Sequence, residues 1–133
     1  MTETPLKDAR ILVIEDDGLS ALVAREMLGE LGCRVAGVAS SVDAALAAIE
    51  NGGAIDCVML DVRLGAEFSS DIATALLKKN VPFVVCSGYS IKLPGMNIPV
   101  VDKPYTAEIL GKALSQALSN RPNEAKGPAR FEP

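Results

Sequence analysis

The sequence contains no histidine, so the side chain that most often serves as a general base or a metal ligand near neutral pH is missing. Cysteine is scarce, and the odd number and the spacing of Cys33, Cys57 and Cys86 fit neither paired disulfides nor a metal site. Two of the three lie within apolar runs that indicate strands. We therefore expect all three cysteines to be buried and reduced.

Long apolar runs and an excess of positive charge are also lacking. No run approaches the roughly 20 apolar residues that a helix needs to cross a bilayer, and the N-terminal MTETPLKDAR has no apolar signal region. We therefore expect a cytoplasmic protein with no membrane contact. The formal net charge of -4 provides no electrostatic footprint for nucleic acid, so we expect no direct nucleic acid binding.

The length of 133 residues suits one domain with little chain left for a second. We divide the chain into an N-terminal extension at 1–7, a domain at 8–120 and a C-terminal tail at 121–133. The tail, RPNEAKGPARFEP, is polar and contains proline and glycine, which predicts disorder. A separate output or catalytic domain is therefore not expected.

Apolar runs alternate with segments of helical spacing, and this alternation predicts an α/β fold. The short runs, rich in β-branched residues, indicate strands buried on both faces. We predict five strands, at 11–14, 34–39, 55–60, 81–86 and 98–101. Helices are predicted from a cap at Asp17 or Ser20 to about 31, from a cap at Ser40 or Ser41 to about 50, and over 69–79 and 106–120. The result is a doubly wound, five-stranded parallel sheet covered by helices on both sides.

Three of the predicted elements have features of their own. The first helix has an apolar face, formed by Leu19, Leu22, Val23, Met27, Leu28 and Leu31. Between the fourth and fifth strands, Pro94 and Gly95 interrupt any full-length helix, so we expect the fourth helix to be short or missing. The fifth strand lies between two prolines, as an edge strand can.

Charged and hydroxyl side chains follow the ends of the predicted strands. They are Glu15, Asp16 and Asp17 after the first strand, Asp61 after the third, Ser87 after the fourth and Lys103 after the fifth. In an open parallel sheet the ligand site lies beyond the carboxyl ends of the strands. Carboxylates gathered there repel unless a cation joins them; Mg²⁺ fits best, and Ca²⁺ fits less well because there is no dedicated calcium loop. With the ammonium of Lys103 and the hydroxyl of Ser87, the sequence predicts a pocket for a metal-bound phosphoryl group.

These residues give the sequence a family resemblance. The stretches ILVIEDD, VMLDVRL around Asp61, FVVCSG around Ser87 and VVDKPY around Lys103, in this order and spacing, resemble the response-regulator receiver domains of two-component signalling. The resemblance covers 8–120 and implies a flavodoxin-like strand order 2-1-3-4-5. It also implies that Asp61 accepts a phosphoryl group as a carboxylate nucleophile. Because the chain has no histidine, the phosphohistidine donor must be another protein, a histidine kinase or a histidine phosphotransfer protein.

The resemblance also assigns roles to the other residues of the predicted pocket. Asp16 would ligate Mg²⁺ directly and Glu15 through a water molecule, while Asp61 and the backbone carbonyl of Arg63 would complete the protein ligands. Lys103 would pair with the phosphoacceptor and later with the phosphoryl group. Ser87 would be the switch hydroxyl, whose movement toward the phosphoryl oxygen pulls its loop and produces the output.

The sequence departs from the receiver pattern in three places, one of which is the segment between Ser87 and Lys103, shorter here than in typical members. Val100 stands where the family has its switch aromatic, so Tyr89 or Tyr105 either substitutes for it or packs over the short loop. The family's Pro-Gly-x loop after the phosphoacceptor is replaced by Leu64-Gly65-Ala66-Glu67. We expect Arg63, Tyr89 and Tyr105 to border the pocket, where they could set the lifetime of the acyl phosphate.

The residues themselves leave simpler alternatives open. Asp61 can cap a turn, Glu15 and Asp16 can solvate a loop, Lys103 can be a surface charge neutralised by Asp102, and Ser87 can be a turn serine. Asp17 is expected to cap the first helix rather than to bind metal.

Our leading hypothesis is a stand-alone, non-enzymatic receiver that acts through phosphorylation-dependent binding of another protein or through phosphotransfer. The alternative is a constitutive interaction module with an uncoupled switch, suggested by Val100 and the short loop. A small phosphatase with an aspartate nucleophile fits poorly, because enzymes resembling the haloacid dehalogenases place a second aspartate where Arg63 stands. The downstream protein and the oligomeric state stay open, a homodimer included.

Overall fold

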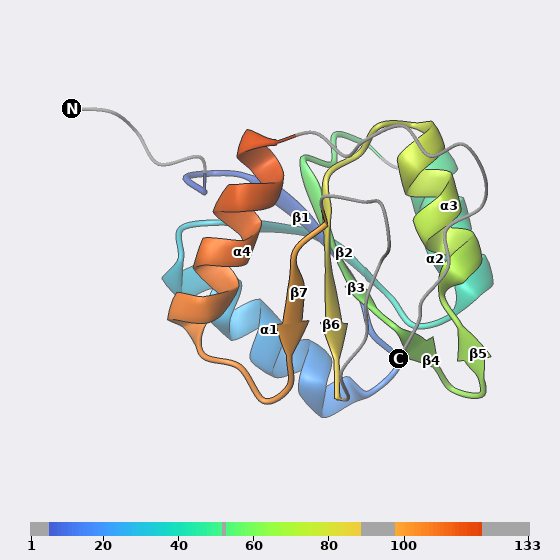
Figure 1. Ribbon diagram of the computed structural model, residues 1–133, viewed down its shortest axis with the longest axis horizontal. Helices are drawn as coiled ribbons and strands as arrows, with labels where there is room; N and C mark the ends of the chain where they lie inside the picture. The colour runs from blue at the N-terminus through green and yellow to red at the C-terminus, as the bar shows by residue number, and fades with distance from the viewer. Residues whose placement is uncertain (1–5, 52, 89–97, 121–133) are drawn as a thin grey trace.

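A five-stranded parallel sheet forms the centre of the computed structural model, which describes residues 6–51, 53–88 and 98–120 (Figure 1). Its strands are β1 (Arg10–Ile14), β2 (Arg34–Ala39), β3 (Cys57–Asp61), β6 (Phe83–Ser87) and β7 (Val100–Asp102). The order β2-β1-β3-β6-β7 confirms the predicted flavodoxin-like arrangement. The last three strands begin two residues later than predicted and end one residue later.

Two pairs of helices cover the sheet, as predicted. The helices are α1 (Gly18–Glu30), α2 (Val42–Asn51), α3 (Ser70–Lys78) and α4 (Ala107–Ser119). Figure 1 shows α1 and α4 on one face and α2 and α3 on the other, and each face has its own buried apolar cluster. Asp17 and Ser41 each accept a backbone N–H bond in the first turn of their helix, which confirms both predicted caps, and Thr106 does the same for α4.

The prediction of the apolar face of α1 was wrong for the first half of the helix. Leu19, Leu22 and Val23 are exposed, whereas Ala21 and Ala24 are buried. The helix lies against the sheet and the neighbouring α4, and small side chains permit such close approach. The larger apolar side chains of this half therefore form part of the surface.

A short hairpin, β4 (Arg63–Leu64) and β5 (Glu67–Phe68), was not predicted and follows β3 directly. Two-residue strands are too short for any periodicity to indicate them. Its turn begins at Gly65, whose φ of 63° fits the glycine that a type II′ turn places at its first central position. In Figure 1 the hairpin projects beside the carboxyl end of the sheet.

Other predictions concern burial, the membrane and surface charge. All three cysteines are buried and free, and burial raises the pKa of Cys57 and of Cys86 to about 12.

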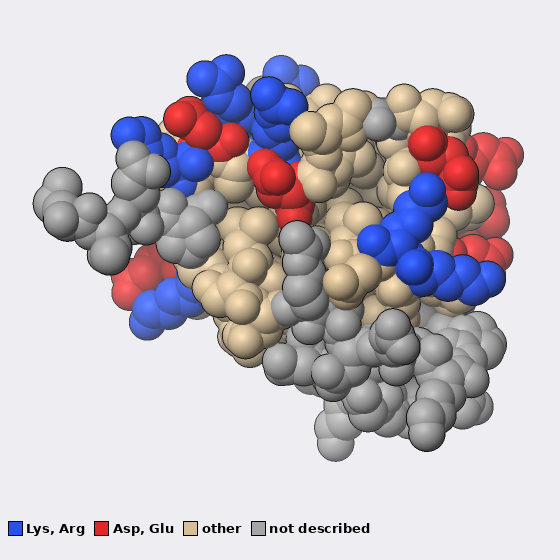
Figure 2. Space-filling view, turned by 90° about the horizontal axis from the view of Figure 1, so that it is seen from above, with Lys and Arg blue, Asp and Glu red and all other residues tan. Residues whose placement is uncertain are grey.

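None of the described helices is long and apolar enough to span a bilayer. Figure 2, which views the amino ends of the strands, shows positive and negative side chains interspersed on that face.

Several predictions fall outside the described residues. They concern the extension at 1–5, the short or missing fourth helix around Pro94 and Gly95, the side chain of Tyr89 and the tail at 121–133. The division of the chain at residues 8 and 120 therefore stays a prediction.

Candidate functional site

The parallel strands bring the predicted site residues to one edge of the sheet. Ile14 at the end of β1 pairs with Leu60 in β3, and Asp61 pairs with Cys86 in β6. Ser87 in turn pairs with Asp102 in β7. All these strands point the same way, so the residues that follow them gather at the lower edge in Figure 1.

Three carboxylates meet at this edge. Glu15, Asp16 and Asp61 each offer an oxygen, and the three oxygens lie within 4.8 Å of one another. Glu15 is buried, Asp61 is half-buried and Asp16 is exposed. Burial, together with a hydrogen bond to Asp61, raises the pKa of Glu15, because both disfavour a second negative charge here.

Lys103 reaches into the carboxylate cluster from the end of β7. Its Nζ donates to Glu15 Oε1 at 2.8 Å and to Asp61 Oδ2 at 3.1 Å. Burial alone would lower the pKa of Lys103, but the hydrogen bond to Glu15 and the charge of Asp61 outweigh it and raise that pKa. The lysine thus pairs with the cluster, which answers the alternative of a surface charge neutralised by Asp102.

The charge and donor set of the cluster fit a divalent cation. Three ionised carboxylates against one ammonium leave a formal charge of minus two, and every side-chain ligand is an oxygen. Glu15 uses Oε1 for Lys103 and Oε2 for the Asp17 N–H at 3.3 Å, which suits a residue that contacts a cation through water. The exposed Asp16 is better placed for direct contact.

Asp17 lies outside this cluster and caps α1. Its Oδ2 accepts from the Ser20 N–H at 2.9 Å and from the Ser20 hydroxyl at 2.6 Å. These bonds lower the pKa of Asp17. The prediction that Asp17 is a cap is confirmed.

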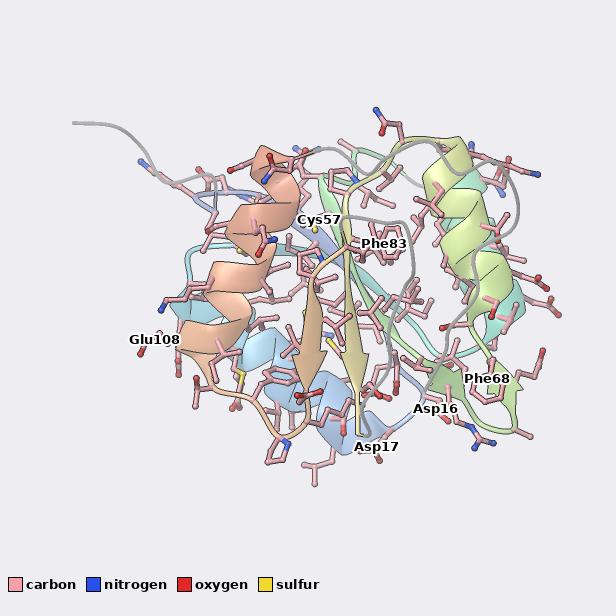
Figure 3. The ribbon with its side chains drawn as sticks, viewed as in Figure 1. Asp16, Asp17, Cys57, Phe68, Phe83 and Glu108 are labelled. Atoms are coloured by element: carbon pink, nitrogen blue, oxygen red, sulfur yellow. The ribbon has the colours of Figure 1, made fainter. Side chains whose placement is uncertain are left out.

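The β4–β5 hairpin is hydrogen-bonded to the carboxylates in ways that the sequence did not indicate. The Gly65 N–H donates to Asp16 Oδ2 at 2.6 Å, and the Arg63 N–H donates to Asp61 Oδ1 at 3.4 Å. The buried Ser69 hydroxyl donates to the carbonyl of Asp61 at 2.6 Å and to that of Val62 at 3.0 Å. No residue-type signal could have found these contacts, since most of them use backbone atoms. Figure 3 labels Asp16 and the hairpin residue Phe68, and Asp16 accepts its bond from Gly65 of the same hairpin.

Ser87 and Tyr105 lie near the cluster, whereas Val100 lies at the opposite end of its strand. Ser87 is buried at the end of β6, and its carbonyl accepts from the Lys103 N–H at 2.7 Å. Tyr105 is half-buried and lines a small cavity with Glu15 and Asp61, and burial raises the pKa of its phenol. Val100 begins the edge strand β7 and is 36% exposed.

An open apolar groove of about 430 Å³ adjoins the carboxylate cluster. It is lined by Leu19, Ser20, Val23 and Met27 of α1 and by Lys103, Pro104 and Tyr105. Lys103 therefore borders both the groove and the charged cluster. The groove is the surface to which the unburied apolar residues of α1 contribute.

No protein-family model and no curated relative matches the sequence. Solved structures do match. SdrG from Sphingomonas melonis Fr1 is 36% identical, with a TM-score of 0.73, over 83% of this chain and 96% of SdrG. A response regulator receiver protein from Sinorhizobium medicae WSM419 is 27% identical, with a TM-score of 0.74, over 86% of this chain and 97% of that protein. The response regulator PhyR from Brucella abortus is 26% identical, with a TM-score of 0.72, over 87% of this chain but only 51% of PhyR, so the chain spans about half of it.

Proposed function

Because this chain belongs to the family of response-regulator receiver domains, we propose that it accepts a phosphoryl group from a phosphohistidine protein onto Asp61. The observation that carries the proposal is the setting of Asp61. Its carboxylate lies at the carboxyl edge of the sheet, paired with Lys103 and within reach of two further carboxylates. The proposed chemistry is therefore the transfer of a phosphoryl group onto the protein's own side chain and not the turnover of a small substrate.

Mg²⁺ is the cofactor that the donor set supports. Asp16 and Asp61 would hold it directly, Glu15 through water and Arg63 through its backbone carbonyl. In an extended residue the N–H and C=O project to the same side of the strand. The Arg63 N–H donates to Asp61, and an extended Arg63 would therefore direct its carbonyl toward the same cluster. When bound, the cation supplies positive charge that offsets the charges of the phosphoryl oxygens.

In the proposed transfer an oxygen of Asp61 attacks phosphorus. The new O–P bond forms as the P–N bond to the donor imidazole breaks, and the electron pair leaves with that nitrogen. Lys103, already bonded to Asp61 Oδ2, is placed to follow the new negative charge onto the phosphoryl group. Ser87, at the end of the adjacent strand, is the proposed hydroxyl donor to a phosphoryl oxygen.

The apolar groove along α1 is the proposed docking surface for the phosphohistidine donor. Transfer requires the donor imidazole to approach Asp61, so the body of the donor must lie on surface next to the cluster. The groove borders the cluster at Lys103 and exposes Leu19 and Val23, and exposed apolar surface of this kind indicates a protein contact. We propose a histidine kinase or a histidine phosphotransfer protein as this partner.

We also propose that the chain produces its output by binding another protein. It would act in the cytoplasm and would not bind nucleic acid. A second candidate, a constitutive interaction module, is favoured by Val100, because valine cannot perform the rotation of a switch aromatic. The two candidate functions predict different behaviour of the backbone amide resonances distant from Asp61. These shift on phosphorylation in a switch and stay unchanged in a constitutive module.

The first test is phosphorylation by acetyl phosphate, followed by intact-protein mass spectrometry. We expect a magnesium-dependent gain of one phosphoryl group that Asp61→Asn abolishes. Asp17→Asn is the matched control, since it alters a neighbouring acid that caps α1, and it should be phosphorylated normally. Phosphorylation that persists in Asp61→Asn would refute the proposal. A short-lived acyl phosphate is detected separately by binding of beryllium fluoride.

A further inference from the structure

The Gly65 N–H forms the shortest contact between the hairpin and the carboxylate cluster. It donates to Asp16 Oδ2 at 2.6 Å across 49 positions of sequence. A hydrogen bond to an ionised carboxylate is among the stronger ones in proteins. It engages one oxygen of Asp16 and leaves the other oxygen for a cation.

The position of this N–H depends on the conformation of Gly65. The residue has a φ of 63° and begins the turn of the hairpin, a conformation that side chains branched at Cβ avoid. A Cβ at this position would meet nothing nearer than Asp16 Oδ2, at 4.0 Å. The requirement for glycine is therefore one of backbone conformation and not of space.

Both ends of the hairpin are anchored to Asp61 at the end of β3 and to Val62, which follows it. The Arg63 N–H contacts Asp61, and at the other end the Ser69 N–H donates to the Val62 carbonyl at 2.8 Å. The Ser69 hydroxyl adds its bonds to the carbonyls of Asp61 and Val62. With its base fixed in this way, the hairpin holds its tip at a defined place above Asp16.

We propose that Gly65 is a positioning residue of the metal site, whose backbone N–H orients the Asp16 carboxylate for Mg²⁺. The inference rests on the proposed function only in taking Glu15, Asp16 and Asp61 as the cation site. Groups that hydrogen-bond to a ligating carboxylate fix its orientation, and their loss typically lowers metal affinity by about 10- to 100-fold. The β4–β5 turn therefore sets the magnesium affinity of the site.

The test is titration of the unphosphorylated full chain with Mg²⁺, followed by backbone amide NMR. Gly65→Val disfavours the positive φ, and we expect it to weaken magnesium binding by about tenfold or more. Gly65→Asn, with a residue that tolerates this conformation, should stay within about threefold of wild type. Ala66→Val is the matched control, because Ala66 is the next residue of the same turn and does not have a positive φ. It should bind Mg²⁺ as wild type does.

Thermal unfolding in a chelator checks that each variant is folded, and Gly65→Ala replaces Gly65→Val if the latter is not. Wild-type affinity in Gly65→Val, or in Gly65→Ala where that variant replaces it, would overturn the inference, as would an equal loss in Ala66→Val or a wild-type protein that binds no magnesium. The titration needs no phosphoryl donor. Magnesium binding without phosphorylation would therefore refute the proposed function alone, while normal phosphorylation with unaltered affinity in the variant would refute this inference alone.

Discussion

The ammonium of Lys103 compensates part of the negative charge of the three carboxylates at one edge of the sheet. This ammonium bonds to Glu15 and Asp61 and leaves the exposed Asp16 to solvent and to the Gly65 N–H. Burial and the neighbouring Asp61 raise the pKa of Glu15 even though the hydrogen bond from Lys103 lowers it. The excess of negative charge at this edge suits the cation that we propose for the site.

The raised pKa of Lys103 predicts how stability depends on pH. The folded protein holds this proton more tightly than the unfolded chain, so the stabilisation is fully present below the ordinary lysine pKa of 10.5. It is lost as pH rises through the higher pKa of the folded state. We expect Lys103→Met to be less stable than wild type by about 2 kcal/mol at pH 7. The gap between the two should narrow above pH 10.5.

Urea denaturation between pH 7 and pH 11.5 measures this gap. The control is Lys112→Met, since Lys112 is highly exposed on α4 and its pairing with Glu108, at 3.9 Å, contributes little. Its stability should follow that of wild type at every pH. A gap for Lys103→Met that stays constant from pH 7 to pH 11.5 would show that the lysine's charge is not the cause.

At the scale of elements, Ser69 joins the β4–β5 hairpin to β3, the strand that ends at Asp61. Its hydroxyl is fully buried and its single hydrogen is shared between the carbonyls of Asp61 and Val62, so Ser69→Ala removes the donor that both acceptors share. We expect a loss of about 1–3 kcal/mol in the free energy of unfolding. Amide hydrogen exchange at 63–68 should also become faster, since the hairpin loses an anchor.

Ser70→Ala is the control for this prediction. The adjacent serine is half-buried in the first turn of α3 and makes no comparable bond to β3. It should change stability and hydrogen exchange little. Equal effects of the two substitutions would mean that the start of α3, and not the bond to β3, determines the result.

The elements also show what the sequence could and could not predict. The five strands and four helices follow from apolar runs and periodicity, and their shared direction places Glu15, Asp61, Ser87 and Lys103 at one edge. The buried face of α1 was predicted poorly, because close packing selects alanine where hydrophobicity alone selects leucine. The contacts of Gly65 depend on a turn in space, and no pattern of residue types encodes them.

Across the whole molecule, the charged cluster and the apolar groove adjoin at one end of the sheet. Burial of α1 through its alanines leaves Leu19 and Val23 free to line the groove, and Lys103 borders both sites. On the proposed function, a small donor such as acetyl phosphate would need only the cluster, whereas a protein donor would need the groove as well. This difference allows the two requirements to be tested separately.

Val23→Gln is therefore expected to affect only transfer from a protein. Val23 lines the groove and does not contact the carboxylates, so the rate with acetyl phosphate should equal that of wild type. Transfer from a phosphohistidine protein that phosphorylates the wild type should fall about fivefold, the effect of losing roughly 1 kcal/mol at an interface. Val38→Gln is the matched control, because Val38 is 41% exposed against 39% for Val23 and lies on the edge strand β2 outside the groove. A similar loss in both variants, or none in Val23→Gln, would place the donor elsewhere. A loss with acetyl phosphate would instead mean that the substitution disturbs the cluster itself.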